Sequence, residues 1–239
     1  MKKNKTMKTM KTKQSMKKVK GFTLIEMSIV LVVIGIILGA VSIGKDLQRN
    51  AVYQKISHSF VQGWALAYQN HFDRVNIVIA DSATTPTLMV NSNAGEVCGA
   101  ALQAFMDAAG IRMPNGRAEG FEDRYVYLDT NGIPQQIDIC FDNIPWSVEG
   151  LTAGSYQNRN KNVMVVKGLT PDLARLLDSS IDGMADSRFG SFRELQYTND
   201  TTSTQRVWSK TNVQNYANAA TNRDESQVAV ITGYYLMPE

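Results

Sequence analysis

The dominant feature of the hydrophobic pattern is an uninterrupted apolar run near the N-terminus. The 18 residues from Met27 to Gly44 contain no charged side chain. Counted from Phe22 the segment has 23 residues. As a helix it would measure about 34 Å, against a hydrocarbon core of roughly 30 Å. The run is therefore long enough to cross a membrane once.

Beyond Gly44 the pattern becomes amphipathic, and nothing in it predicts a helix end. No proline occurs before Pro86, so the helix has no compulsory break there. We expect one helix of about 50 residues, with 22–44 in the membrane and 45–73 covering a globular domain. Apolar residues recur at near-helical spacing in its second half: Val52, Ile56, Phe60, Trp64, Ala67 and Phe72.

The remaining residues, 74–239, are predicted to form an α+β domain whose antiparallel sheet packs against the amphipathic helix. The clearest signal is a hairpin, in which Arg124–Asp129 and Ile133–Phe141 flank an Asn131-Gly132 turn. The other predicted elements are helices over Gly99–Gly110 and from Thr170 onward, strands over Val163–Lys167 and Val228–Leu236, and loops over Asp81–Gly95 and Asn199–Ser226, the last with Val207 and Trp208 near the core.

Charge divides the chain into two unlike parts. The formal net charge is +3, from 25 basic and 22 acidic residues, yet the first 21 residues hold nine lysines and no acid. The rest of the chain therefore has a net charge of −6, which argues against a nucleic-acid-binding domain. By the positive-inside rule the lysines keep the N-terminus cytoplasmic and send the domain across the membrane.

Three interpretations of the N-terminal segment compete. An ordinary signal peptide would be cut near Ala40–Ser42, but Glu26 inside its apolar region would cost a few kcal/mol to insert. A plain signal anchor tolerates Glu26 as an acid in the first helical turn. In the third interpretation the chain is cut before the apolar run and Glu26 has a purpose of its own.

The residues Lys20-Gly21-Phe22-Thr23-Leu24-Ile25-Glu26-Met27 favour the third interpretation. They resemble the processing site of type IV pilins and type II secretion pseudopilins. The resemblance implies that 1–21 is a leader, that a prepilin peptidase cuts between Gly21 and Phe22, and that Phe22 is then N-methylated. It also implies that Glu26 meets the N-terminal ammonium of a neighbouring subunit, which would pair two costly charges and set the axial register.

The resemblance implies a pilin-like fold and a structural subunit of a type IV pilus or related filament. The mature size tilts the choice toward a minor pilin; a type II secretion pseudopilin is the alternative. The partners would be the peptidase, other pilin subunits and the inner-membrane assembly platform. The chain would cross the inner membrane once, with its domain periplasmic and then extracellular in a pilus. The motif alone does not distinguish a pilus, a secretion pseudopilus and a DNA-uptake filament. It also does not show whether translation starts at Met1 or at Met16.

Two residue pairs carry further structural predictions. Cys98 and Cys140 are expected to form a disulfide in the oxidising periplasm, with buried free thiols as the alternative. Gly35 and Gly39 form a Gly-x-x-x-Gly step that permits close helix approach. The competing interpretation is that glycine is simply common in apolar spans.

Little in the sequence indicates catalysis or a cofactor, and we expect no enzyme. His58 and His71 lie 13 positions apart on the predicted helix, without the spacing of a zinc helix. An exported or anchored enzyme or binding protein remains the contrasting class. Asp178, Asp182 and Asp186 could gather a calcium ion, but they lack the alternating ligands of a calcium loop, so solvated turn acids are favoured.

Overall fold

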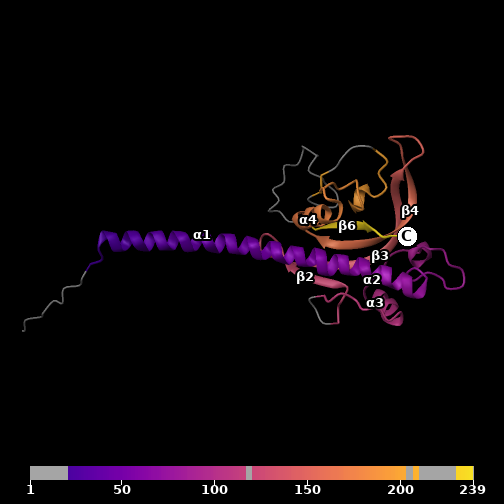
Figure 1. Cartoon of the computed structure of the whole chain (residues 1–239), viewed down its shortest axis with the longest axis horizontal. Helices are drawn as coiled ribbons and strands as arrows, with labels where there is room; N and C mark the ends of the chain where they lie inside the picture. Colours follow the sequence, from indigo (N-terminus) through magenta and orange to yellow (C-terminus); the bar gives the residue numbers. More distant parts are fainter. Residues whose placement is uncertain (1–20, 117–119, 203–206, 210–229, 239) are drawn as a thin grey trace, which may run out of the picture. The chain divides into compact units, whose positions relative to one another are not determined.

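The structure is a computed structural model that describes residues 21–116, 120–202, 207–209 and 230–238 (Figure 1). The predicted leader, 1–21, lies outside the described residues except for Gly21. The chain divides into two compact units, Met1–Asp46 and Leu47–Glu239, and each is described by itself.

The long N-terminal helix is built from three consecutive segments. They are α1 (Leu24–Lys55), the π-helical η1 (Ile56–Val61) and α2 (Gln62–Val75). Together they run for 52 residues, which confirms the expected length. The helix ends where Asn76 adopts a left-handed conformation (φ 57°) and its backbone N–H donates to the Phe72 carbonyl.

The first part of this helix, which belongs to the first unit, is exposed and apolar. Leu24 is 92% and Ile36 67% exposed. Among the described residues it is the one helix that is long and apolar enough to cross a membrane, and its most apolar window buries nothing within the chain. Such a surface is stable in lipid or against other apolar helices rather than in water.

The second unit contains a six-stranded antiparallel sheet in the order β1-β3-β4-β6-β5, with β2 also paired to β3. The predicted hairpin is confirmed as β2 and β3, and the predicted strand over Val163–Lys167 lies in the C-terminal half of a much longer one. The strands are β1 (Val97–Cys98), β2 (Arg124–Leu128), β3 (Pro134–Glu149), β4 (Tyr156–Leu169), β5 (Phe192–Glu194) and β6 (Ile231–Leu236).

The short helices occur where the sequence predicted them. After α3 (Gly99–Ala108) the chain turns at Gly110 (φ 65°). At the start of α4 (Pro171–Asp182) the Thr170 hydroxyl caps the first turn by accepting from the Leu173 N–H. Within the globular unit α4 lies beside β5 and β6 (Figure 1). The loop after α2 contains η2 (Val90–Asn93), and η3 (Leu195–Tyr197) follows β5.

Aromatic side chains join η1 and α2 to the sheet. Phe60 packs on Tyr125 with ring centroids 5.2 Å apart, and Tyr68 stacks on Phe141 at 5.1 Å. Trp64 is fully buried, and its indole N–H donates to the Glu122 carbonyl. The domain is therefore α+β, with the amphipathic part of the long helix packed on an antiparallel sheet.

Candidate functional site

The predicted cleavage site lies in non-helical backbone directly before α1. Gly21, Phe22 and Thr23 are outside the helix, and Phe22 is 78% exposed. A peptidase needs a peptide bond that is not held in a helical hydrogen-bond ladder, and the Gly21–Phe22 bond meets this condition. The structure places the bond one turn away from Glu26.

Glu26 forms a capping box with Thr23. Its Oε2 atom accepts hydrogen bonds from the Thr23 backbone N–H at 2.7 Å and from the Thr23 hydroxyl at 2.8 Å. In return the Thr23 hydroxyl oxygen lies 3.3 Å from the Glu26 backbone nitrogen and accepts its proton. This reciprocal arrangement satisfies backbone donors at the start of a helix.

The capping box directs the carboxylate toward the start of the helix. Phe22, whose nitrogen would become the mature N-terminus, immediately precedes the Thr23 nitrogen that Glu26 binds. The same carboxylate thus has a partner within its own chain in addition to the neighbouring subunit expected from the resemblance. The sequence interpretation missed this capping role of Glu26, although the Thr-x-x-Glu spacing is typical of a capping box.

Gly35 and Gly39 lie four positions apart on α1, so they share one face of the helix. A Cβ atom added at either residue would have no neighbour within 4 Å. The folded chain by itself therefore makes no use of their small size. Any requirement for glycine at these positions must come from contact with another helix.

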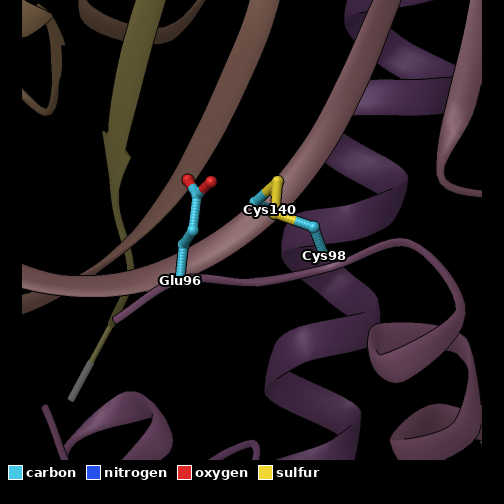
Figure 2. A group of neighbouring side chains, drawn as sticks. All are labelled: Glu96, Cys98 and Cys140. Carbon is cyan, nitrogen blue, oxygen red and sulfur yellow. A yellow bond between two sulfur atoms is a disulfide. The ribbon is translucent and has the colours of Figure 1, made fainter. Parts of the chain in front are cut away.

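A disulfide joins Cys98 in β1 to Cys140 in β3, as Figure 2 shows. The two residues are direct cross-strand partners with Cα atoms 4.4 Å apart. Glu96 lies beside them, with ligand atoms of the three residues all within 4.8 Å of one another. Because the two sulfurs are bonded to each other and Glu96 is paired with Lys167, the group offers no thiolate ligands for a metal.

The prediction of solvated turn acids was wrong for Asp178 and Asp186, whereas Asp182 is partly exposed. Asp178 is fully buried and Asp186 is 5% exposed. The Oδ2 atom of Asp178 accepts a hydrogen bond from the Asp186 backbone N–H at 2.6 Å, and Asp182 accepts from the backbone N–H groups of Ser191 and Phe192. These carboxyls fold the turn between α4 and β5, and burial raises the pKa of Asp178 to about 8.

Two buried carboxyl groups hold the segment 207–209. The Trp208 indole N–H donates to Asp178, and the Ser209 backbone N–H donates to Oε2 of the fully buried Glu194 at 2.9 Å. Burial raises the pKa of Glu194 to about 7. Trp208 is buried against Phe192, as expected for a core contact, whereas Val207 is 45% exposed. Residues 203–206 and 210–226 of the predicted loop lie outside the described residues.

The two histidines occupy different environments on the long helix. His58 is exposed, and its Nδ1 atom lies 3.2 Å from the Gln62 side-chain oxygen. His71 is 5% exposed and lines a cavity at the end of α2. Within the part of the chain that the structure describes, neither is hydrogen-bonded to a nucleophile or to a carboxylate.

Within the described residues the fold is pilin-like, and it carries one N-terminal helix whose length and apolar surface fit membrane anchoring. Comparison with family models agrees: residues 16–42 match the prokaryotic N-terminal methylation motif, the signature of type IV pilins and pseudopilins. The chain therefore carries the processing signal of a prepilin peptidase substrate. Comparisons with curated proteins and with solved structures gave no match.

Proposed function

We propose that this chain is a structural subunit of a type IV pilus or related filament, most consistent in size with a minor pilin. The observation that carries the proposal is the methylation motif at 16–42, which includes most of the exposed apolar part of a 52-residue helix. A pilin subunit needs both features, because the motif permits processing and the apolar helix supplies the filament core.

In this proposal the leader orients the chain, and the helix anchors it in the inner membrane until assembly. The nine lysines keep the N-terminus cytoplasmic, and the second unit folds in the periplasm. The assembly platform then transfers the apolar surface of α1 from lipid to neighbouring helices. Gly35 and Gly39 would allow those helices to approach closely.

Cleavage after Gly21 would leave an ammonium group on Phe22 at the membrane. A lone charge there is costly unless it is paired. We propose that Glu26 of an adjacent subunit supplies the paired carboxylate and so fixes the axial register. The role is structural, and catalysis forms no part of it.

The intact mass of the protein purified from membranes tests the proposal. The mature chain should retain 218 of the 239 residues, beginning with an N-methylated Phe22. The variant Gly21→Leu should keep its leader and stay in the membrane without assembling. A chain that begins at Ile43 would instead show an ordinary signal peptide, and an unprocessed wild-type chain would show a plain anchor; either result contradicts the proposal.

A type II secretion pseudopilin is the second candidate, since the same motif marks it. Deleting the gene separates the two. Loss of surface filaments with normal protein secretion supports the pilus subunit, whereas loss of secretion with normal filaments supports the pseudopilin.

A further inference from the structure

Two Asn-Gly steps occur in the sequence, at Asn115-Gly116 and at Asn131-Gly132. In such a step the backbone nitrogen of the glycine can attack the side-chain carbonyl carbon of the asparagine, because glycine has no side chain to shield that nitrogen or to restrict the backbone. The two reacting groups belong to neighbouring residues, so no second molecule has to be brought up. How readily the ring closes depends on how the fold holds the glycine nitrogen.

The fold holds the Asn131-Gly132 step firmly in the turn between β2 and β3. The Gly132 N–H donates to the Asp129 carbonyl at 3.0 Å. The Asp129 carboxylate accepts from the Asn131 N–H at 2.8 Å and from the Ile133 N–H at 2.9 Å. Attack by the Gly132 nitrogen would break a hydrogen bond and distort this turn, so the step is protected although Asn131 is exposed.

The Asn115-Gly116 step is held differently. Both residues lie in irregular backbone between α3 and β2, and Asn115 is exposed to water. Within the described ranges no group accepts a hydrogen bond from the Gly116 N–H. The Gly116 nitrogen can therefore attack without first giving up a hydrogen bond.

We propose that Asn115 is a site of spontaneous covalent modification, at which the Gly116 nitrogen closes a succinimide ring and the asparagine becomes aspartate or isoaspartate. Hydroxide removes the proton from the Gly116 nitrogen, which then forms a bond to Cγ of Asn115. The bond from Cγ to Nδ2 breaks, and Nδ2 takes a proton from water and leaves as ammonia. Water then opens the ring at either of its two carbonyl carbons, so the net change is the gain of one water and the loss of one ammonia.

The surroundings of Gly116 give the isoaspartate product a structural consequence. A Cβ atom added at Gly116 would clash with the carbonyl oxygen of Arg124, the first residue of β2, and would lie 2.6 Å from that of Phe121. The backbone of Gly116 therefore packs directly on this segment. Isoaspartate lengthens the main chain before Gly116 by one carbon atom and disturbs this contact, whereas Asn115→Asp adds the same negative charge and leaves the backbone unchanged.

The proposal is independent of the filament role, and its test compares the two steps within one protein, the full-length mature chain in phospholipid nanodiscs. Samples are incubated at mildly alkaline pH and digested, and the masses of the peptides that contain Asn115 and Asn131 are measured. The Asn115 peptide should gain the mass difference between a hydroxyl and an amino group and separate into two products of equal mass. In the folded chain Asn115 should convert at least about five-fold faster than Asn131, the factor expected for one net hydrogen bond. In urea with reductant the two rates should be similar, because neither nitrogen is then held.

Two variants and an unincubated sample complete the test. A sample digested before incubation measures the conversion that digestion itself causes. Asn115→Gln should show no conversion at position 115, because its ring would be larger and closes far more slowly. Incubated wild-type protein should melt at a lower temperature than Asn115→Asp, which isolates the effect of the lengthened backbone. Absence of the mass gain at Asn115 in the folded chain, equal folded-state rates for the two steps, or the same ratio of rates in urea would overturn the proposal.

Discussion

The indole nitrogen of Trp208 donates a 2.6 Å hydrogen bond to the Oδ2 atom of Asp178, 30 positions earlier in the chain. Both side chains are fully buried. The same carboxyl oxygen also binds the backbone of Asp186, so one acid holds the turn after α4 and the segment 207–209 together. Because its pKa is raised to about 8 by burial, this acid is largely protonated at neutral pH.

The raised pKa values predict that the domain loses stability as the pH rises. Between about pH 4 and 8 the folded state keeps a proton on Asp178 that the unfolded chain has released, and Glu194 behaves in the same way up to about pH 7. Each group lowers the free energy of unfolding by up to about 1.4 kcal/mol per pH unit in its window. Thermal melting followed by circular dichroism from pH 5 to 8 should show the melting temperature falling.

The variant Asp178→Asn isolates this effect, because asparagine resembles the neutral carboxyl group in shape and keeps an oxygen for Trp208. It should show a flatter pH profile than the wild type and melt higher at pH 8. Asp107→Asn, which removes an exposed carboxylate from α3, should retain the wild-type slope. A wild-type melting temperature that is constant or rises between pH 5 and 8 contradicts the assignment of a protonated Asp178.

Substitutions at Thr23 and Glu26 separate the two roles of the carboxylate. Glu26→Gln keeps a side chain able to complete the capping box but removes the charge. Thr23→Val removes the hydroxyl partner and keeps the charge. If register depends on pairing with the Phe22 ammonium, Glu26→Gln should assemble poorly and Thr23→Val nearly normally, with equal membrane insertion in both.

The yield of sheared filaments measures assembly, and carbonate extraction of membranes measures insertion. Glu26→Val serves as the control that lacks both the cap and the charge. Assembly of Glu26→Gln at the wild-type level, together with failure of Thr23→Val, would show that capping is the essential role and would exclude the register hypothesis.

Removal of the Cys98–Cys140 disulfide should destabilise the domain strongly. The two cysteines are 42 positions apart, and for a loop of that length the chain-entropy model gives about 4 kcal/mol. In a domain of this size that corresponds to roughly 10 °C in melting temperature. A Cys98→Ser, Cys140→Ser double variant should melt about this much lower and should be insensitive to reductant. A wild-type protein whose melting is unchanged by reductant would contradict the prediction.

Gly168 and Gly154 form a matched pair for testing a close backbone contact. Both have φ of 78°, but a Cβ atom at Gly168 would clash with the Gln136 carbonyl oxygen, whereas one at Gly154 would meet nothing within 4 Å. Gly154→Ala should cost about 1 to 2 kcal/mol for the left-handed conformation alone. Gly168→Ala should lower the free energy of unfolding by at least about 2 kcal/mol more, because β3 and β4 must separate to admit the methyl group. Urea titration of both variants measures the difference, and equal costs would exclude the contact.

Local signals along the chain predicted much of the fold. The uninterrupted apolar run and the absence of proline predicted the 52-residue helix, Asn131-Gly132 predicted the β2–β3 hairpin, and Thr170-Pro171 predicted the start of α4. The processing motif is also a contiguous string, which is why Gly21, Phe22 and Glu26 stand out as candidates in the amino-acid sequence alone. In each case neighbouring residues determine the outcome through backbone preference or direct recognition.

Other features depend on contacts between distant residues. The sequence interpretation placed Asp178 and Asp186 in solvent, because acidic residues near a glycine turn are usually exposed. Asp178 is buried beside Trp208, which donates a hydrogen bond to it from a segment that no local pattern connects to α4. The full lengths of β3 and β4 were likewise underestimated, since polar residues such as Asn143 and Asn162 pair across the two strands.

The sequence by itself revealed the processing motif and the apolar helix, because each is a contiguous segment on which the rest of the fold has little influence. The tertiary structure decided which acids are buried and where the π-helical segment falls. Burial and hydrogen-bond satisfaction are properties of the packed chain, and they arise only when residues far apart in sequence exclude water together.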